Sequence, residues 1–253
     1  MIQAAEPILS VRGLCKNFGA LAVTHSVDLN LESGARVGLI GPNGAGKTTL
    51  VNLLTGVISA DAGSILLGGE AIDKLKPEDR VHRGLVRTHQ INTLLVENSV
   101  RDNVAIAIAE RERYAWRALR FTRQWRACLE EAEERLQEIG LAREADQEVR
   151  HLPYGEQRLL EIAIAMALKP RVLLLDEPGA GVPSTEAHII HEVLDHLPSD
   201  IAILIIEHDM DLVFRFAHEI IVLVQGRVLT RDVPEKIAAD PEVRAVYLGK
   251  SVK

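Results

Sequence analysis

Apolar and polar positions along the chain follow two different periods. Near the N-terminus, positions 23, 27, 29 and 31 are apolar, whereas positions 24, 26, 28 and 30 are polar. A period of two is typical of a strand with one buried face. The mostly apolar run at 35–40 predicts a fully buried strand that leads into a glycine-rich turn.

Three other segments repeat their apolar residues at i, i+3, i+4 and i+7 or a similar helical spacing, and each is therefore predicted to be a helix with one buried face. The inward residues are Leu50, Leu53, Leu54 and Val57 in the first, Leu129, Ala132, Leu136 and Ile139 in the second, and Leu159, Ile162, Ala163 and Met166 in the third.

The second half of the chain alternates short apolar runs with helical segments. Residues 172–175 and 201–206 are continuous apolar runs, as expected for parallel strands covered on both faces. Residues 220–230, with Gln225 and Gly226 between two apolar runs, predict a terminal hairpin. This order predicts an α/β fold with a mainly parallel sheet.

Composition narrows the possible functions. The 253 residues carry a net charge of −7, with 47% hydrophobic and 26% charged residues, which is an ordinary globular balance. An acidic chain lacks the positive field of a general nucleic-acid binder. Two distant cysteines, Cys15 and Cys128, exclude a disulfide scaffold and fit a reducing compartment. We expect neither a secretory signal nor a membrane span, so any membrane role would depend on a partner.

The segment Gly41–Thr48, GPNGAGKT, matches the phosphate-binding loop pattern between a predicted strand and a predicted helix. Glycines let backbone N–H groups converge on phosphate oxygens, and the helix adds its positive N-terminal end. Lys47 is expected to reach the β- and γ-phosphates and Thr48 to bind Mg²⁺.

Two adjacent carboxylates complement this loop. Asp176 ends the apolar run 172–175 and is expected to hold Mg²⁺, directly or through water. Glu177 is placed to orient or deprotonate the attacking water. The alternative, a solvated acidic turn, is disfavoured by the phosphate-binding loop in the same chain.

With these motifs, nearly the whole chain resembles the ATP-binding cassette family. Gln90 in VRTHQ resembles the glutamine that contacts Mg²⁺ and the membrane partner, and the segment 152–163, LPYGEQRLLEIA, resembles the signature sequence. His208 in IIEHDM resembles the histidine that senses the γ-phosphate. Phe18 resembles the aromatic that stacks on adenine, although a core phenylalanine is the alternative.

The resemblance implies a P-loop NTPase (RecA-like) core with an N-terminal antiparallel β subdomain and an inserted helical subdomain at about 92–168, all within a single ATP-binding domain over 1–253. It implies ATP and Mg²⁺ as cofactors and catalytic roles for Lys47, Gln90, Glu177 and His208, with Mg²⁺ on Thr48, Gln90 and Asp176. Its expected nucleotide contacts are Phe18, Asn43, Gly44, Gly46, Lys47, Thr48, Thr49, Tyr154, Gly155 and Glu156.

Within the family, the likeness is to ATP-binding subunits of branched-chain amino acid importers, carried by VRTHQ, YGEQRLLEIA, LLLDEP, IIEHDM and DPEVRAVYLGK. Importers of urea, amides or aromatic acids share much of this pattern. The implied assembly is a head-to-tail pair with a second ATP-binding subunit, either a copy or a sister chain. It works on transmembrane permease subunits and, indirectly, with a periplasmic or extracellular solute-binding protein. The implied location is cytoplasmic, on the inner face of the cell membrane, with no nucleic-acid partner.

Two residues depart from the family pattern. Pro153 replaces the usual signature serine, whose hydroxyl meets the γ-phosphate, and the loss of one such donor predicts a slower but live ATPase. Pro183 stands where an acidic residue usually ends the turn after Glu177, which puts communication between two ATP sites in doubt.

Two further patterns leave alternatives open. Segment 111–126 holds six arginines and one glutamate, a net charge of +5, with four aromatics. It is read as a solvated helical insertion paired with the acidic stretch 130–148, as a lipid-facing segment, or as a nucleic-acid strip. His188, His191 and Asp195 share a predicted helix face, which favours surface residues over a metal site.

Rival functions are the motor of a lipid or lipopolysaccharide exporter and a soluble cassette ATPase acting on nucleic acid or the ribosome. Repair ATPases insert long coiled coils between the phosphate loop and the signature, but here Lys47 and Gly155 are only 108 residues apart. Translation-type members carry two cassettes, and this chain has one.

Overall fold

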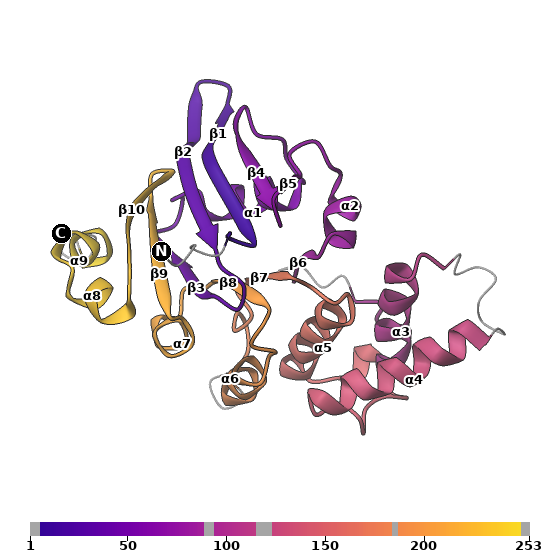
Figure 1. Cartoon of the computed structure of the whole chain (residues 1–253). Helices are drawn as coiled ribbons and strands as arrows, with labels where there is room; N and C mark the ends of the chain where they lie inside the picture. Colours follow the sequence, from indigo (N-terminus) through magenta and orange to yellow (C-terminus); the bar gives the residue numbers. More distant parts are fainter. Residues whose placement is uncertain (1–5, 89–93, 115–122, 184–186, 249–253) are drawn as a thin grey trace, which may run out of the picture. The chain divides into compact units, whose positions relative to one another are not determined.

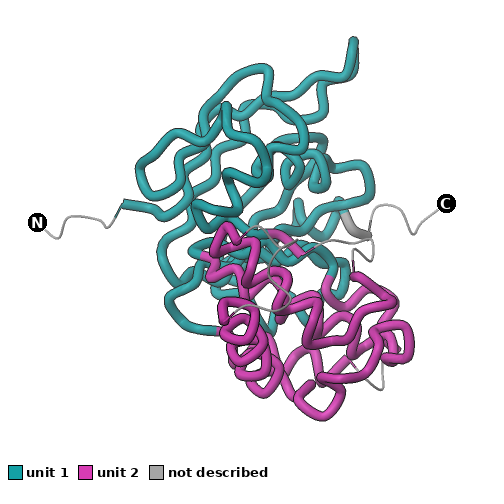
Figure 2. Tube along the Cα trace, turned by 90° about the vertical axis from the view of Figure 1, so that its right-hand side faces the viewer, with its two compact units in different colours: residues 1–86, 171–177, 198–253 teal, residues 87–170, 178–197 magenta. Residues whose placement is uncertain are grey.

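The computed structural model describes residues 6–88, 94–114, 123–183 and 187–248 (Figure 1). The chain divides into two compact units, shown in teal and magenta in Figure 2. The first comprises 1–86, 171–177 and 198–253, and the second comprises 87–170 and 178–197. Residues 92–168, where the helical insertion is expected, fall within the second unit. The bounds of this insertion and a single domain over the whole chain stay predictions.

The first unit is built on two sheets. The antiparallel sheet has the order β2-β1-β4-β5, from Leu21–Leu31, Leu9–Phe18, Ala62–Leu67 and Glu70–Ala71. The six-stranded sheet has the order β10-β9-β3-β8-β7-β6, from Arg227–Asp232, Glu219–Val224, Arg36–Ile40, Ala202–Ile206, Val172–Asp176 and Leu85–Arg87. The expected α/β fold is confirmed, with β9, β3, β8 and β7 parallel and β9–β10 an antiparallel hairpin.

The helices of the first unit are α1 (Lys47–Thr55), α2 (Pro77–His82), α7 (Met210–Phe216), α8 (Pro234–Ala239) and α9 (Pro241–Leu248). The apolar face of α1 and the inner faces of both sheets share one buried core, with Leu50, Leu54, Leu9, Leu39 and Leu204 among its members. Because α1 and β3 are both anchored in this core, the short loop that joins them is held at both ends.

The second unit is helical among its described residues. Its helices are α3 (Val100–Arg111), α4 (Arg123–Glu138), α5 (Tyr154–Ala167) and α6 (Ala187–Asp195), with a 3₁₀ turn, η2, at Val149–His151. The predicted inner faces of α4 and α5 are confirmed in part. Ala132, Leu136, Leu159, Ile162 and Ala163 are buried. Leu129 and Met166 are only half-buried, and Ile139 is buried just beyond the end of α4. No helix in the described part of the chain is both long and apolar enough to cross a membrane.

Two details of the predicted pattern are wrong. In β2, Thr24 is buried, because a bulge at Ser26 (φ 53°) shifts the pairing with β1 and reverses the alternation before it. Val57 does not continue the buried face of α1 but is 57% exposed. The helix ends at Thr55, and Gly56 follows as a left-handed cap (φ 79°).

Candidate functional site

The carboxyl ends of β3, β7 and β8 lie at one edge of the six-stranded sheet because these strands are parallel. The residues that follow them line a cavity of about 380 Å³ within the first unit. Its lining is Val23, Asn43, Gly44, Ala45, Gly46, Lys47, Thr48, Thr49, Glu177, Ile206 and His208. Sequence segments far apart in the chain therefore converge on one site.

Gly46 shapes the loop that opens this cavity. It is the N-cap of α1 with φ 101°, and a Cβ built on it would lie 2.8 Å from the carbonyl oxygen of Val23. Only glycine fits this conformation and this close approach to β2. The first-turn N–H groups of α1 have no partner within the helix, which makes this helix N-terminus suited to an anion.

Lys47 is the first residue of α1 and is only 7% exposed. Its Nζ donates hydrogen bonds to the carbonyl oxygens of Gly41 (2.6 Å) and Pro42 (3.3 Å) in the preceding loop. Burial lowers the pKa of Lys47, and the nearby carboxylates of Glu177 and Asp176 oppose this shift. The ammonium is thus held at the cavity with two acidic groups close by.

Glu177 and His208 form a pair at the cavity wall. Glu177 follows β7 in a left-handed conformation (φ 51°), and its N–H donates to the carbonyl oxygen of Ile206 (2.8 Å). This geometry brings Glu177 Oε1 to 2.9 Å from His208 Nε2. Asp176, the last residue of β7, is buried and does not line the cavity.

Glu207 directly precedes His208 but does not line the cavity, and we did not predict a role for it. It is buried, and its Oε2 accepts the backbone N–H groups of His208 (2.9 Å) and Asp209 (3.4 Å). Its position directly before His208 in IIEHDM is the only signal for it in the sequence.

Phe18 ends β1 and is 51% exposed, so the alternative of a core phenylalanine is wrong. Its ring centre lies 5.7 Å from Lys16 Nζ, and it is not among the residues that line the cavity. An exposed aromatic face is available for stacking, but adenine stacking on Phe18 stays a prediction.

The signature segment belongs to the second unit. Tyr154, Gly155 and Glu156 form the first turn of α5, and Pro153 is its N-cap (φ −52°) without a side-chain capping bond. Proline fits there because its φ is compatible with a helix start and its missing N–H is not needed. Gln90 lies outside the described residues.

Of the expected site residues, the structure brings eight to the cavity: Asn43, Gly44, Gly46, Lys47, Thr48, Thr49, Glu177 and His208. This donor set fits a nucleotide's phosphates, since it offers helix N–H groups, a buried ammonium and hydroxyls. The hydroxyl of Thr48 and the neighbouring carboxylates are hard oxygen ligands of the kind that Mg²⁺ takes.

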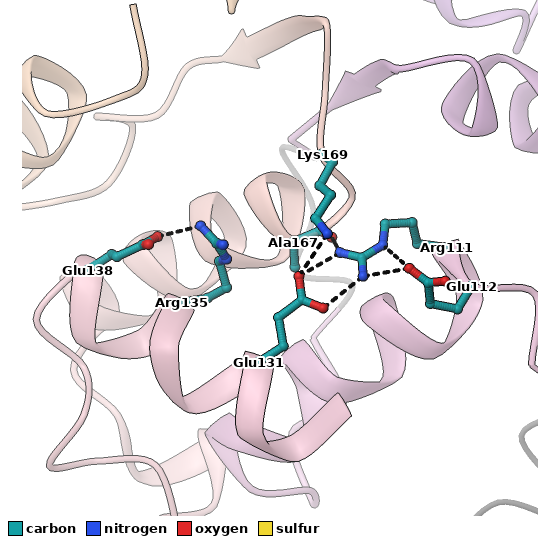
Figure 3. A network of polar contacts seen from close by, with 7 residues as sticks. All are labelled: Arg111, Glu112, Glu131, Arg135, Glu138, Ala167 and Lys169. Atoms are coloured by element: carbon teal, nitrogen blue, oxygen red, sulfur yellow. Dashed lines mark hydrogen bonds and ion pairs between the residues drawn. The ribbon is translucent and has the colours of Figure 1, made fainter. Parts of the chain in front are cut away.

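The basic segment 111–126 is partly accounted for by the second unit (Figure 3). Arg111 ends α3, and its guanidinium donates to the carboxylate of Glu131 in α4 (2.7 and 2.9 Å) and to the carbonyl oxygen of Ala167 in α5 (2.7 Å). Arg111 therefore ties three helices together. For this one arginine, the contact with Glu131 agrees with the reading of the segment as paired with the acidic stretch 130–148. Residues 115–122 of this segment lie outside the described part.

His188, His191 and Asp195 lie on α6. Among the described residues, no set of three or more His, Cys, Asp or Glu side chains could hold a metal ion.

A glycine loop that ends in Lys47 and Thr48 joins a strand to a helix, and carboxylates lie at the ends of neighbouring parallel strands. These features define a P-loop NTPase. A profile described as "ABC transporter" matches residues 24–180. The chain belongs to the ABC transporter family and is an ABC-type ATPase that binds ATP.

Curated relatives extend this likeness over nearly the whole chain. The high-affinity branched-chain amino acid transport ATP-binding protein LivG of Escherichia coli is 38% identical over 254 residues, covering 98% of this chain and 100% of LivG. The corresponding BraF of Pseudomonas aeruginosa is 37% identical over 257 residues, covering 98% and 100%. A crystal structure of an ATP-binding cassette of an ABC transporter in its ADP conformation matches with a TM-score of 0.84, 29% identity and coverage of 97% and 100%.

Proposed function

We propose that this chain is the ATP-hydrolysing subunit of an importer of branched-chain amino acids or related amino acids and amides. The observation that carries the proposal is the 37–38% identity to LivG and BraF over 98% of the chain. The cavity residues support it, because the phosphate loop, Glu177 and His208 converge on one cavity in the structure. In this proposal the whole chain acts as one ATP-binding domain.

The phosphate loop binds the nucleotide in this proposal. The N–H groups at the start of α1 and the ammonium of Lys47 hold the phosphates, while Asn43, Gly44, Gly46 and Thr49 shape the rest of the cradle. Thr48 and Gln90, with Asp176 directly or through water, would hold Mg²⁺, which would neutralise charge on the phosphate oxygens. Phe18 stacks on the adenine.

Glu177 orients and deprotonates the attacking water, and His208 senses the γ-phosphate. The 2.9 Å contact between Glu177 Oε1 and His208 Nε2 supports a joint role, because each can fix the orientation of the other. Lys47 contributes charge stabilisation in the reaction, and Gln90 links the site to the membrane partner.

The signature segment acts on a second nucleotide in this proposal. Tyr154, Gly155 and Glu156 begin α5, whose N-terminal end faces the γ-phosphate bound to a second ATP-binding subunit. The pair drives transmembrane permease subunits from the inner face of the cell membrane, and a solute-binding protein supplies the solute on the other side.

The test is transport by the assembled system. The chain would be purified together with the membrane proteins that bind it and reconstituted in liposomes with ATP and Mg²⁺ inside or outside. Uptake of radiolabelled leucine, urea and a phenylalanine analogue would be compared, with lipid flipping as the exporter arm. Matched control vesicles would carry Glu177→Gln, which keeps the shape of the side chain and removes the base.

ATP-dependent leucine uptake that Glu177→Gln abolishes supports the proposal. ATP-dependent lipid or lipopolysaccharide movement without solute uptake would replace it with the exporter. ATPase activity no higher than that of Glu177→Gln would overturn the assignment of a live motor.

A further inference from the structure

Tyr154 contacts a turn that is distant in sequence but part of the same unit. The turn is 179–183, which follows Pro178 and is closed by a hydrogen bond from Val182 N–H to the carbonyl oxygen of Gly179 (3.2 Å). Gly181 lies in it with φ 77°, and a Cβ built there would sit 3.0 Å from Cε1 and 3.1 Å from the hydroxyl oxygen of Tyr154. The ring of Tyr154 therefore covers the face of Gly181 that a side chain would occupy.

Arg158, one turn further along α5, holds this ring. Its guanidinium carbon lies 5.0 Å from the ring centre, and its Nη2 donates a hydrogen bond to the tyrosine hydroxyl. Both a cation–π contact and a charged hydrogen bond thus fix one side chain.

Arg158 is itself fixed by a buried ion pair. Its Nη1 donates to Glu161 Oε2 at 2.6 Å, and both side chains are more than nine-tenths buried. An arginine held in this way has little rotamer freedom, so it presents its guanidinium to Tyr154 in one orientation. The chain of contacts runs from the middle of α5 through Arg158 and Tyr154 to Gly181.

We propose that Tyr154 is a positioning residue, which fastens the turn 179–183 to the first turn of α5 so that the signature segment and this turn move as one body. Burial alone does not explain the ring's position, because Tyr154 is 36% exposed. The contacts with Arg158 and Gly181 do.

The consequence for catalysis rests on the function proposed above. If the start of α5 faces a second subunit's nucleotide, the turn that Tyr154 fastens approaches that subunit with it. A change in the signature segment then reaches the turn 179–183 through Tyr154.

The first test measures amide hydrogen exchange in the purified full-length chain, and it needs neither permease nor turnover. Tyr154→Ala should speed exchange in a peptide covering 178–183 about tenfold, while peptides from α1 keep their rates. Tyr154→Phe keeps the ring on Gly181 and the cation–π contact and should show less than half of this effect on a logarithmic scale.

Tyr114→Ala is the matched control, because Tyr114 lies in the same unit with the same 36% exposure, whereas the atoms nearest to a Cβ on Gly181 all belong to Tyr154. It should leave the 178–183 peptide unchanged. Equal rates in Tyr154→Ala and wild type, or an equal increase in Tyr114→Ala, would overturn the proposal.

The second test uses the assembled transporter. Tyr154→Ala should lower kcat for ATP hydrolysis about tenfold, and Tyr154→Phe, which keeps the ring on Gly181, should lower it less than threefold. If the wild-type assembly lacks ATPase activity, the proposed function fails, and the exchange test still decides the role of Tyr154. Faster exchange with an unchanged kcat would overturn the catalytic consequence.

Discussion

Glu207 and Pro153 each shape the backbone beside a residue that is expected to act in catalysis or to contact the nucleotide. Neither is expected to react itself. Glu207 accepts the backbone N–H groups of His208 and Asp209, so its carboxylate shapes the turn between β8 and α7. Pro153 caps α5 where a hydroxyl would be expected from the resemblance. Both effects operate through the backbone, which is why residue type alone does not reveal them.

Glu207→Ala should lower the ATPase kcat about tenfold, because the turn that carries His208 loses its acceptor. Glu207→Gln keeps an oxygen at the same place and should lose less than threefold. Steady-state ATPase of the assembled transporter, with thermal melting of both variants, measures this. Equal losses in the two variants at equal Tm would contradict a backbone-positioning role.

Pro153→Ser should raise the ATPase kcat by about tenfold or more, because it restores a hydroxyl donor at the start of α5. Pro153→Ala is the control, since it removes the ring without adding the hydroxyl. A rise of the same size in Pro153→Ala would show that the ring, rather than the missing donor, limits the rate.

The sequence predicted the cavity residues well because the phosphate-loop spacing is tied to backbone geometry. Asn43, Gly44, Gly46, Lys47, Thr48 and Thr49 are consecutive or nearly so, and one strand–loop–helix unit brings them together. The pairing of Glu177 with His208 could not be read in the same way, because it depends on β7 and β8 being neighbours in the sheet.

At the scale of elements, buried arginines join helices by donating hydrogen bonds to carbonyl oxygens near the helix ends. Arg80 in α2 is buried and donates to the carbonyl oxygens of Leu53 (2.8 Å) and Leu54 (2.6 Å) in the last turn of α1. It also donates to the carbonyl oxygens of Asp73 and Leu75. A cation at a helix C-terminus satisfies free carbonyls and complements the helix dipole.

Arg80→Leu should lower the free energy of unfolding by about 3 kcal/mol, because several buried carbonyls lose their donor. Arg83→Leu is the matched control on the same segment. Arg83 pairs with Glu70 at 3.4 Å with both side chains exposed, so its loss should cost less than about 1 kcal/mol. Urea unfolding of the purified chain measures both, and equal costs would refute the capping role.

The contact of Glu131 with Arg111 and Lys169 joins α3, α4 and the segment after α5 (Figure 3). Hydrogen bonds from Arg111 are the main cause that lowers the pKa of Glu131 from 4.5 to about 2. A carboxyl whose pKa is lower in the folded state stabilises the fold above its unfolded pKa. That stabilisation is lost as the pH falls from about 4.5 towards about 2.

Glu131→Gln should therefore destabilise the protein most above about pH 5, and its difference from wild type should shrink as the pH falls towards about 3. Glu138→Gln on the same helix is the control, because its pair with Arg135 is exposed and should have little effect at any pH. Urea unfolding across this pH range tests it. A difference between wild type and Glu131→Gln that is constant with pH would count against the ion pair as the cause.

Periodicity predicted α1, α4 and α5 but not how they end or join. The buried face of α1 stops before Val57 because Gly56 caps the helix, and Thr24 is buried because Ser26 forms a bulge. Arg80 carries no sequence signal for its role, since its partners are backbone carbonyl oxygens. For Arg111 the charge pattern indicated an acidic partner in 130–148, but neither Glu131 in particular nor the carbonyl oxygen of Ala167. Such contacts follow from tertiary packing.

At the scale of the whole molecule, the cavity at the phosphate loop and the signature segment belong to different compact units. The resemblance predicted this separation as a helical insertion, and the fold class is confirmed. Assembly with a second subunit stays a prediction, because it concerns two chains and depends on surfaces that one chain's sequence pattern does not define.

ATP should cause association of Glu177→Gln with a second ATP-binding subunit, because the variant binds ATP and cannot hydrolyse it. Light scattering of the variant alone, and mixed with a sister ATPase from the same transporter, should show twice the mass of one chain only with ATP. The double variant Lys47→Ala, Glu177→Gln should stay monomeric. Association without nucleotide, or none in either mixture, would contradict the proposed pair.

Lys47 has a bearing on how any loss-of-function variant at this loop is interpreted. Its ammonium donates hydrogen bonds to the carbonyl oxygens of Gly41 and Pro42 in the same loop. When a phosphate binds, its hydrogen bonds to Lys47 replace these bonds and are not simply added to them. The measured nucleotide affinity is therefore the difference between two bonded states. A Lys47 variant loses the hydrogen bonds within the loop as well as the contact with the phosphate. The order of the nucleotide-free loop therefore has to be compared between variant and wild type before weak binding is attributed to the lost charge.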